Sequence, residues 1–139
     1  MFHSVELRTY CHATEDEERV RRALRTLAPD CDPSTERLEG AHGNPILLLT
    51  CRLERREAIE GFWRRVRDAG AFPQALEGIA DRMDDDAVLH LRFAKQQAFV
   101  GGIELARDDD VIAVRAKVVA HPAKKGAAVK AAREYLGGL

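Results

Sequence analysis

Alternation of apolar and polar residues constrains the fold of this chain more than any other feature of its sequence. A period of two predicts a β-strand with one buried face and one exposed face. The clearest example is residues 88–94, in which Leu89, Leu91 and Phe93 alternate with His90, Arg92 and Ala94. The same alternation recurs in residues 2–12, 46–53 and 111–121. These segments therefore predict strands of one sheet.

The 88–94 pattern ends at three polar residues, Lys95, Gln96 and Gln97. We expect them to continue from the end of the strand as an exposed polar segment before Gly101 and Gly102 allow the chain to turn. A solvated loop end is the simpler interpretation of the same residues.

A hairpin turn is predicted where a short strand over residues 36–41 meets the strand at 46–53. Gly43 tolerates a left-handed backbone, and Pro45 favours extended geometry at Asn44. Both preferences suit a chain reversal between two neighbouring strands.

Helices are predicted where apolar residues recur at helical spacing between the strands. Thr14 and Glu17 form a capping box, which indicates the start of the first helix. Pro122 suits the first position of the last helix. Two helices are expected over residues 55–69 and 72–83, and the last helix is expected to continue over residues 124–136.

This order of elements predicts an α+β protein with one mostly antiparallel sheet and helices packed on one face. A chain of 139 residues is long enough for one domain with a real core, so we expect a single domain over residues 1–139.

The outer sheet face becomes basic when the predicted strands are combined. If helices cover Leu7, Leu49, Leu91 and Val114, the opposite face collects Arg8, Tyr10, His12, Arg52, His90, Arg92, Arg115 and Lys117. The whole chain has a net charge of only −1, so this positive charge is local. Arginine and lysine neutralise phosphates, and aromatic or imidazole rings can stack on bases. Exposed strand positions also carry basic residues simply for solubility and to discourage edge pairing.

Metal binding and catalysis receive no support from the sequence. Asp84–Asp86 and Asp108–Asp110 are expected to be solvated turns, since no EF-hand spacing accompanies them. A zinc site is disfavoured because Cys11 and His12 point to opposite faces of a strand. No nucleophile with a base is recognisable. We therefore predict no cofactor and no enzymatic activity.

The cysteines and the hydropathy suggest a compartment. Cys11, Cys31 and Cys51 are odd in number, form no Cys-x-x-Cys pair and follow no secretory signal. They predict small buried thiols in a reduced, cytoplasmic protein rather than a disulfide scaffold. No apolar run approaches the roughly 18 residues needed to span a bilayer, so no membrane partner is expected.

Four sequence segments, in the same order and at matching distances, resemble a known family. They are VELRTYCHATEDEERV at residues 5–20, LEGAHGNPI at 38–46, LRFAKQQAFVGG at 91–102 and DDVIAVRAKVVAHPAKK at 109–125. Together they are similar to an archaeal family of small RNA-binding proteins, often described as predicted exosome subunits. The resemblance spans nearly the whole chain and implies RNA binding without known catalysis. It also implies a fold like that of large-subunit ribosomal protein L-five.

The resemblance marks individual positions of this chain. They are His12, Thr14, Glu15, Gly40, Gly43, Asn44, Pro45, Arg92, Lys95, Gln96, Arg115, Lys117, Pro122 and Lys124. Thr14, Gly43 and Pro45 are explained by capping and turn geometry. The family often has an acidic residue before its Lys-Gln pair, where this chain has Ala94. If such an acid orients the lysine, Lys95 must be held differently here.

We predict that the chain binds RNA through the basic sheet face and adjoining loops, in RNA processing, decay or ribosome biology. The predicted RNA-binding residues are Arg8, Tyr10, His12, Arg52, His90, Arg92, Lys95, Gln96, Gln97, Arg115, Lys117 and Lys124. Lysine would neutralise phosphate, and glutamine would reach 2′-hydroxyls or base edges. The first alternative is an adaptor that docks on an RNA-processing complex such as the exosome without touching RNA. A small-molecule enzyme is a more distant one, which a pocket with a strongly perturbed titratable group would favour.

Overall fold

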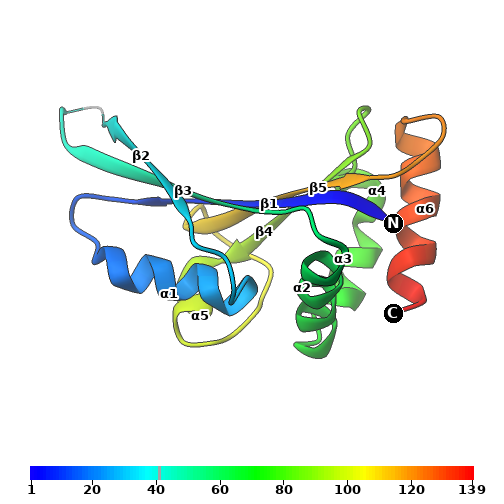
Figure 1. Ribbon diagram of the computed structural model, residues 1–139, viewed down its shortest axis with the longest axis horizontal. Helices are drawn as coiled ribbons and strands as arrows, with labels where there is room; N and C mark the ends of the chain where they lie inside the picture. The colour runs from blue at the N-terminus through cyan, green and yellow to red at the C-terminus, as the bar shows by residue number, and fades with distance from the viewer. Residues whose placement is uncertain (41) are drawn as a thin grey trace.

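The computed structural model describes residues 1–40 and 42–139, and in these residues the strands form one antiparallel sheet. The strands are β1 (Phe2–Cys11), β2 (Ser34–Glu39), β3 (Pro45–Leu53), β4 (Val88–Ala94) and β5 (Val111–Val118). Their order across the sheet is β2-β3-β1-β5-β4, so β1 pairs with β3 on one side and β5 on the other. Figure 1 shows the sheet along the upper side of the molecule.

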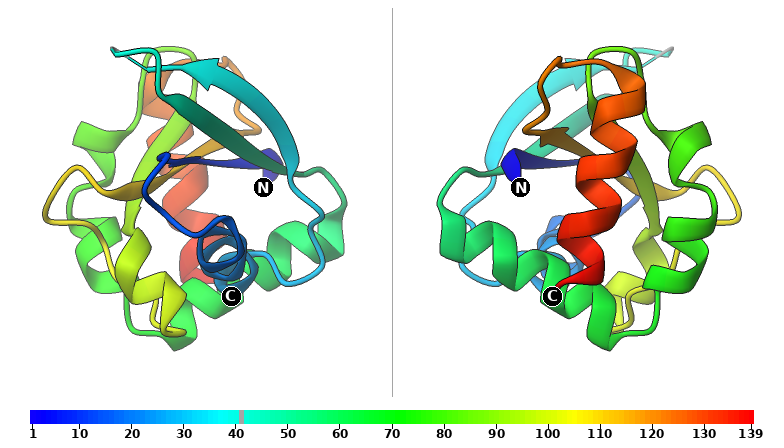
Figure 2. Two further views of the ribbon diagram at one scale, coloured as in Figure 1. Left: turned by 90° about the vertical axis from the view of Figure 1, so that its left-hand side faces the viewer. Right: turned by 90° about the vertical axis from the view of Figure 1, so that its right-hand side faces the viewer.

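The helices lie on one side of this sheet and leave its other face uncovered (Figures 1 and 2). They are α1 (Glu17–Leu27), α2 (Arg56–Asp68), α3 (Phe72–Glu77), α4 (Ile79–Arg82), α5 (Lys95–Phe99) and α6 (Lys125–Gly137). The predicted α+β class, with one antiparallel sheet and helices on one face, is confirmed. Within the described ranges, no helix has both the length and the apolar character needed to cross a membrane.

The core lies between the helices and the inner side of the sheet. Val5, Leu7, Leu49, Leu91 and Val114 are each at most 1% exposed, which confirms the predicted inward positions. The helices contribute Leu24, Phe62, Trp63 and Ala128 to the same cluster. Burying an aliphatic or aromatic side chain of this size stabilises a fold by about 1.5–3 kcal/mol. The alternation in the sequence therefore identifies the face that holds the sheet against the helices.

Local patterns predicted the hairpin turn correctly and the cap of α1 incorrectly. Gly43 has φ +74°, which confirms its left-handed backbone between β2 and β3. The sequence suggested Thr14 as the cap of α1, and this prediction is wrong. The side chain of Asp16 instead accepts a hydrogen bond from the backbone N–H of Glu18. Asp16 is the cap because it directly precedes the first helical residue, where the helix dipole also stabilises a carboxylate.

Three further expectations about helices are corrected. The segment 72–83 forms two short helices, α3 and α4, separated at Gly78, rather than one. Pro122 lies in the loop before α6, which begins only at Lys125. Lys95 does not extend β4 as a polar loop end: it begins the short helix α5, which carries the chain below the sheet beside α1 (Figure 1).

The prediction that all cysteines are free thiols is wrong for two of them. Cys31 and Cys51 form a disulfide, with Cα atoms 6.0 Å apart, a normal separation for such a bond. Cys51 points inward from β3, and the loop after α1 brings Cys31 against it. The sequence spacing carries no signal of this approach, because the two residues belong to different elements. Cys11 is free and buried, and burial raises the pKa of its thiol.

Candidate nucleic-acid interface

The uncovered side of the sheet, called here the open face, brings together most of the predicted RNA-binding residues. Strand alternation places there the side chains of Arg8, Tyr10, Arg52, His90, Arg92, Arg115 and Lys117. In the strand register Glu6 lies opposite both Arg52 and Arg115. Ala113 likewise lies opposite both Arg8 and Arg92. The sheet therefore carries two neighbouring rows of positive charge.

The open-face arginines that form ion pairs do so with exposed or partly exposed acidic residues. Arg52 lies 3.5 Å from Glu6 and 3.4 Å from Glu54, and Arg92 lies 3.6 Å from the fully exposed Asp109. Exposed pairs of this kind contribute little, typically less than about 1 kcal/mol. Among the residues that the structure describes, Arg8 and Arg115 form no ion pair. These two guanidinium groups are free to contact an anionic ligand.

A hollow of about 410 Å³ lies on the open face, where small residues leave room between larger ones. Its lining includes Ala113 and Val111 of β5. The polar residues that line it are Arg8, Tyr10, His12, His90, Arg92, Lys95, Asp109, Asp110 and Arg115. His12 directly follows β1 and is exposed, as predicted. The residues expected to stack on bases and those expected to contact phosphates thus meet at one place.

Three further predicted residues, His90, Lys117 and Lys124, lie in β4, in β5 and in the loop after β5. His90 Nε2 lies 2.8 Å from a carboxylate oxygen of Asp84. Together with backbone N–H donors, this hydrogen bond holds the pKa of Asp84 below its usual range. The Lys117 ammonium donates to the carbonyl oxygen of Asp86. Lys124 is exposed in the loop between β5 and α6, where nothing prevents contact with a ligand on the open face.

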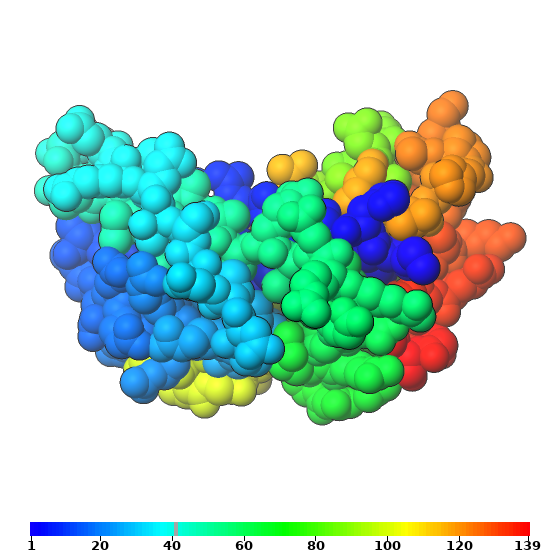
Figure 3. Space-filling view, in the orientation of Figure 1, coloured from blue at the N-terminus to red at the C-terminus, as the bar shows by residue number. Residues whose placement is uncertain are grey.

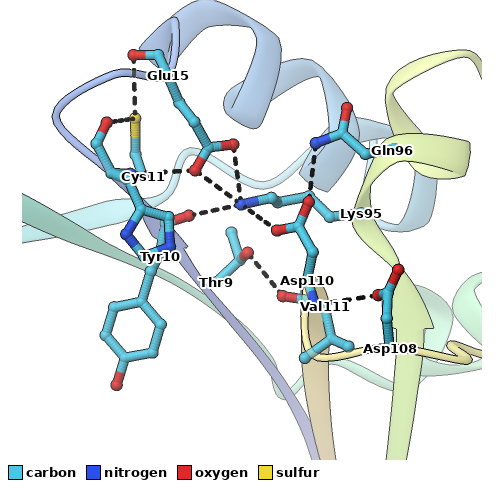
Figure 4. Close-up of polar contacts among 10 residues, drawn as sticks. Thr9, Tyr10, Cys11, Glu15, Lys95, Gln96, Asp108, Asp110 and Val111 are labelled. Atoms are coloured by element: carbon cyan, nitrogen blue, oxygen red, sulfur yellow. Dashed lines mark hydrogen bonds and ion pairs between the residues drawn. The ribbon is translucent and has the colours of Figure 1, made fainter.

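Lys95 occupies a different environment from the arginines, and its predicted exposure is wrong. Its side chain is 3% exposed. Its ammonium lies 2.8 Å from Asp110 Oδ1, 3.0 Å from Glu15 and 3.0 Å from the carbonyl oxygen of Tyr10 (Figure 4). All three partners accept hydrogen bonds from the one donor group. Lys95 therefore ties the end of β1, the loop before α1 and the loop before β5 to the start of α5.

Gln96 belongs to the same group, which we call the lysine cluster: Glu15, Lys95, Gln96 and Asp110. The Gln96 side-chain amide donates to Asp110 Oδ2 at 2.9 Å. Burial alone would raise the pKa of Asp110, but the hydrogen bonds from Lys95 and Gln96 and the Lys95 charge outweigh it and lower that pKa. Gln97 is exposed on α5, below the sheet. Gln96 and Gln97 thus do not line the hollow of the open face, while Lys95 borders it with its ammonium already bonded to Asp110 and Glu15.

Asp110 and Glu15 were not predicted as partners of Lys95. Asp110 was expected in a solvated triple-aspartate turn, and period-two or helical patterns carry no signal that an acid 15 residues after a lysine reaches it. The resemblance marked Glu15 without giving its role. It did indicate that Lys95 must be held differently here if the acidic residue that Ala94 replaces orients the lysine in the family. Glu15 and Asp110 supply the negative charge beside Lys95. No cluster able to hold a metal ion occurs in the described part of the chain.

A second hollow, of about 780 Å³, lies between α2, the loop after α1 and the end of β3. Of the predicted residues, Arg52 alone lines it. Arg65, also in its lining, donates to the carbonyl oxygen of Leu27, and burial lowers the pKa of its guanidinium. This hollow therefore collects no set of groups that points to a reaction or to nucleic acid.

Fold and site define an α+β protein with one antiparallel sheet, covered by helices on one face and basic on the other. The chain belongs to a family described as RNA binding, which matches residues 4–118. It is 37% identical to RNA-binding protein PAB1135 of Pyrococcus abyssi, over 98% of this chain and 94% of that protein.

Solved structures of related archaeal proteins have the same fold. A DUF54 protein from Methanothermobacter thermautotrophicus is 39% identical, covers 98% of each chain and superposes with a TM-score of 0.86. A DUF54-family protein from Archaeoglobus fulgidus is 32% identical, covers 96% of this chain and 99% of its own, and gives a TM-score of 0.87. The likeness extends over nearly the whole chain.

Proposed function

We propose that the protein binds RNA through the open face and acts in RNA processing, decay or ribosome biology without catalysing a reaction. The observation that carries this proposal is the segregation of charge. The whole chain has a net charge of −1, yet the strand positions of the open face carry Arg8, Arg52, Arg92, Arg115 and Lys117 against Glu6 and Glu36. Phosphate backbones are bound by such local positive surfaces regardless of net charge.

The proposed contacts differ from those expected from the sequence in one region. Arg8, Arg52, Arg92, Arg115, Lys117 and Lys124 contact phosphates, while Tyr10, His12 and His90 are available to bases. Lys95 and Gln96 do not contact RNA, because their polar groups are already bonded within the lysine cluster. Gln97 lies on the helix side of the sheet. Lys95 and Gln96 act by positioning the loops beside the open face.

The test compares two double variants that remove the same charge from opposite sides of the molecule. Arg8→Gln with Arg115→Gln removes the two guanidinium groups of the open face that have no ion pair. Arg64→Gln with Arg133→Gln removes two exposed arginines from α2 and α6. Arg65 is unsuitable as a control because it is half-buried and bonded to Leu27.

We expect the open-face variant to weaken binding of a generic RNA by roughly tenfold per arginine, since hydrogen bonds to charged groups contribute about 1.5–3 kcal/mol. The slope of log affinity against log salt should fall in magnitude by about 0.7–0.9 for each arginine lost. The helix variant should change neither quantity appreciably. Equal losses in both variants, or wild-type binding that does not respond to salt, would contradict the proposed site and favour an adaptor.

The wider role rests on the family and on the related protein rather than on the geometry. PAB1135 is named an RNA-binding protein, and nothing in that name specifies an RNA. Association with the exosome or another RNA-processing complex, a cytoplasmic location, a single domain over residues 1–139 and a likeness to ribosomal protein L-five remain proposals. Crosslinking in cells followed by sequencing of the attached RNA tests the role directly. One stable structured RNA would indicate ribosome or tRNA biology, and diverse fragments would indicate decay.

A further inference from the structure

The open face offers a poor platform for stacked bases. Of the eight aromatic side chains in the sequence, Tyr10 is exposed, at 47%, while the others are buried or half-buried in the core and around the helices. His90 is drawn toward Asp84 by its hydrogen bond. Sheet proteins that bind single-stranded RNA stack two or three successive bases on neighbouring aromatic rings. One tyrosine cannot hold a strand in that way.

The positive charges on the open face form a two-dimensional array instead of a line. Arg52 and Arg115 lie on either side of Glu6, and Arg8 and Arg92 lie on either side of Ala113. Strands are about 4.8 Å apart, so each pair is separated by roughly 10 Å at the backbone. The two rows are about 7 Å apart along the strands. A single strand follows one path over such an array, whereas a double helix presents two phosphate backbones to it.

The surface around this array is concave. Figure 3 shows the upper face hollowed between two raised ends. The β2–β3 hairpin forms one end, and the turn before β4 together with the loop before α6 forms the other (Figure 1). The second end carries the exposed residues Lys124 and Lys125 beside the acidic turn Asp84–Asp86. A rod-shaped ligand lying across the strands would therefore touch the basic floor and come near Lys124 and Lys125 at one end.

We infer that the open face takes base-paired, helical RNA, held through its phosphates and 2′-hydroxyls, rather than a stacked single strand. This inference rests on the proposed function and names its ligand class. Double-stranded RNA is recognised by shape and by backbone contacts, because side chains cannot reach the bases in its narrow major groove. The open face supplies what such recognition requires: spread positive charge, a concave surface and little dependence on aromatic stacking.

The experiment titrates the wild-type protein with three probes of one sequence at several salt concentrations. They are an RNA duplex of about 20 base pairs, longer than the roughly 16 that a double-stranded-RNA-binding domain spans, one of its strands alone, and the corresponding DNA duplex. We expect the RNA duplex to bind at least tenfold tighter than the single strand. It should also bind tighter than the DNA duplex, which lacks 2′-hydroxyls and A-form geometry.

Two variants separate stacking from backbone contact. Tyr10→Ala should weaken duplex binding by less than about threefold, whereas loss of a stacked base costs roughly fivefold or more. Arg8→Gln with Arg115→Gln should weaken duplex binding by about a hundredfold. Circular dichroism spectra and melting temperatures of both variants establish that they are folded.

Two outcomes would contradict the helical-RNA inference, and the second would also contradict the proposed function. If the single strand binds as tightly as the duplex, or if Tyr10→Ala loses tenfold, the ligand is not helical RNA, and RNA binding by the open face stands. If neither RNA binds, the proposed function itself fails and the inference fails with it.

Discussion

The open face and the lysine cluster both contain basic residues, yet the surroundings of these residues are opposite. Arg115 is exposed and Arg8 half-buried in the middle of the sheet, and neither forms an ion pair in the described ranges. Lys95 is 3% exposed and contacts two carboxylates and a backbone carbonyl. The two arginines can therefore still donate hydrogen bonds to a ligand, whereas the Lys95 ammonium already donates its hydrogen bonds within the fold.

Burial, rather than residue type, thus separates a binding residue from a structural one. A buried ammonium is costly unless carboxylates and hydrogen bonds compensate it, and removing one partner leaves the others uncompensated. An exposed guanidinium is solvated with or without a ligand, so its removal leaves the fold nearly unchanged. The two regions should therefore respond to mutation in opposite assays, stability for one and RNA affinity for the other.

The largest expected effect is on the lysine cluster. Lys95→Met keeps much of the aliphatic stem but removes the ammonium from Glu15, Asp110 and the Tyr10 carbonyl. Breaking a buried ion pair in this way should lower the free energy of unfolding by about 3 kcal/mol, the lower end of the usual range because both acids are partly exposed. Urea unfolding measures the loss. Lys124→Met, an exposed lysine, should change stability by less than about 0.5 kcal/mol. A Lys95→Met variant as stable as wild type would remove the distinction between the two regions.

The next effect depends on pH. Asp110→Asn removes a carboxylate that accepts hydrogen bonds from Lys95 and Gln96, so it should cost about 1.5–3 kcal/mol near pH 7. The pKa of Asp110 is lowered in the folded protein, so its contribution is present above the unfolded value of about 3.9 and is lost as the pH falls through the lowered folded value. Urea midpoints at pH 7, 5 and 3 should therefore show wild type and variant converging in acid. A constant difference across these pH values would contradict the assignment.

The neighbouring aspartate provides the matched case on the open face. Asp109 is fully exposed and lies 3.6 Å from Arg92, so Asp109→Asn should change stability by less than about 0.5 kcal/mol. Removing a negative charge beside Arg92 should raise RNA affinity by about two- to fivefold at low salt, equivalent to less than about 1 kcal/mol. The effect should shrink as salt increases. If Asp109→Asn destabilises the fold as Asp110→Asn does, adjacent residues do not belong to two separate regions.

The strand faces could be predicted from the sequence because alternation is a local property. Leu91 and Arg92 differ in hydropathy, and their side chains must point to opposite sides of one strand. Seven of the predicted residues lie on the open face for this reason: Arg8, Tyr10, Arg52, His90, Arg92, Arg115 and Lys117. The fold class followed from the same pattern and from the order of the elements.

The lysine cluster could not be predicted because it depends on contacts between distant segments. Lys95 lies 80 residues from Glu15 along the chain, and period-two alternation stops at Ala94. The pairing of Cys31 with Cys51 was missed for the same reason. The local sequence around a lysine that follows an amphipathic strand is the same whether its ammonium is solvated or lies between two carboxylates. Only the tertiary fold distinguishes these environments.

The smallest expected effect separates Gln96 from Gln97, which the sequence treats alike. Gln96 donates to Asp110 at 2.9 Å near the surface, so Gln96→Ala should lower the free energy of unfolding by about 0.5 kcal/mol, the low end for one neutral donor. Gln97 is exposed and forms no side-chain hydrogen bond in the described part of the chain, so Gln97→Ala should leave stability unchanged. Neither variant should alter RNA affinity or its salt slope, because both side chains lie away from the open face. Urea unfolding and RNA titration of the two variants provide the measurement. A loss of RNA affinity in either variant would restore these residues to the interface and extend the binding surface beyond the sheet.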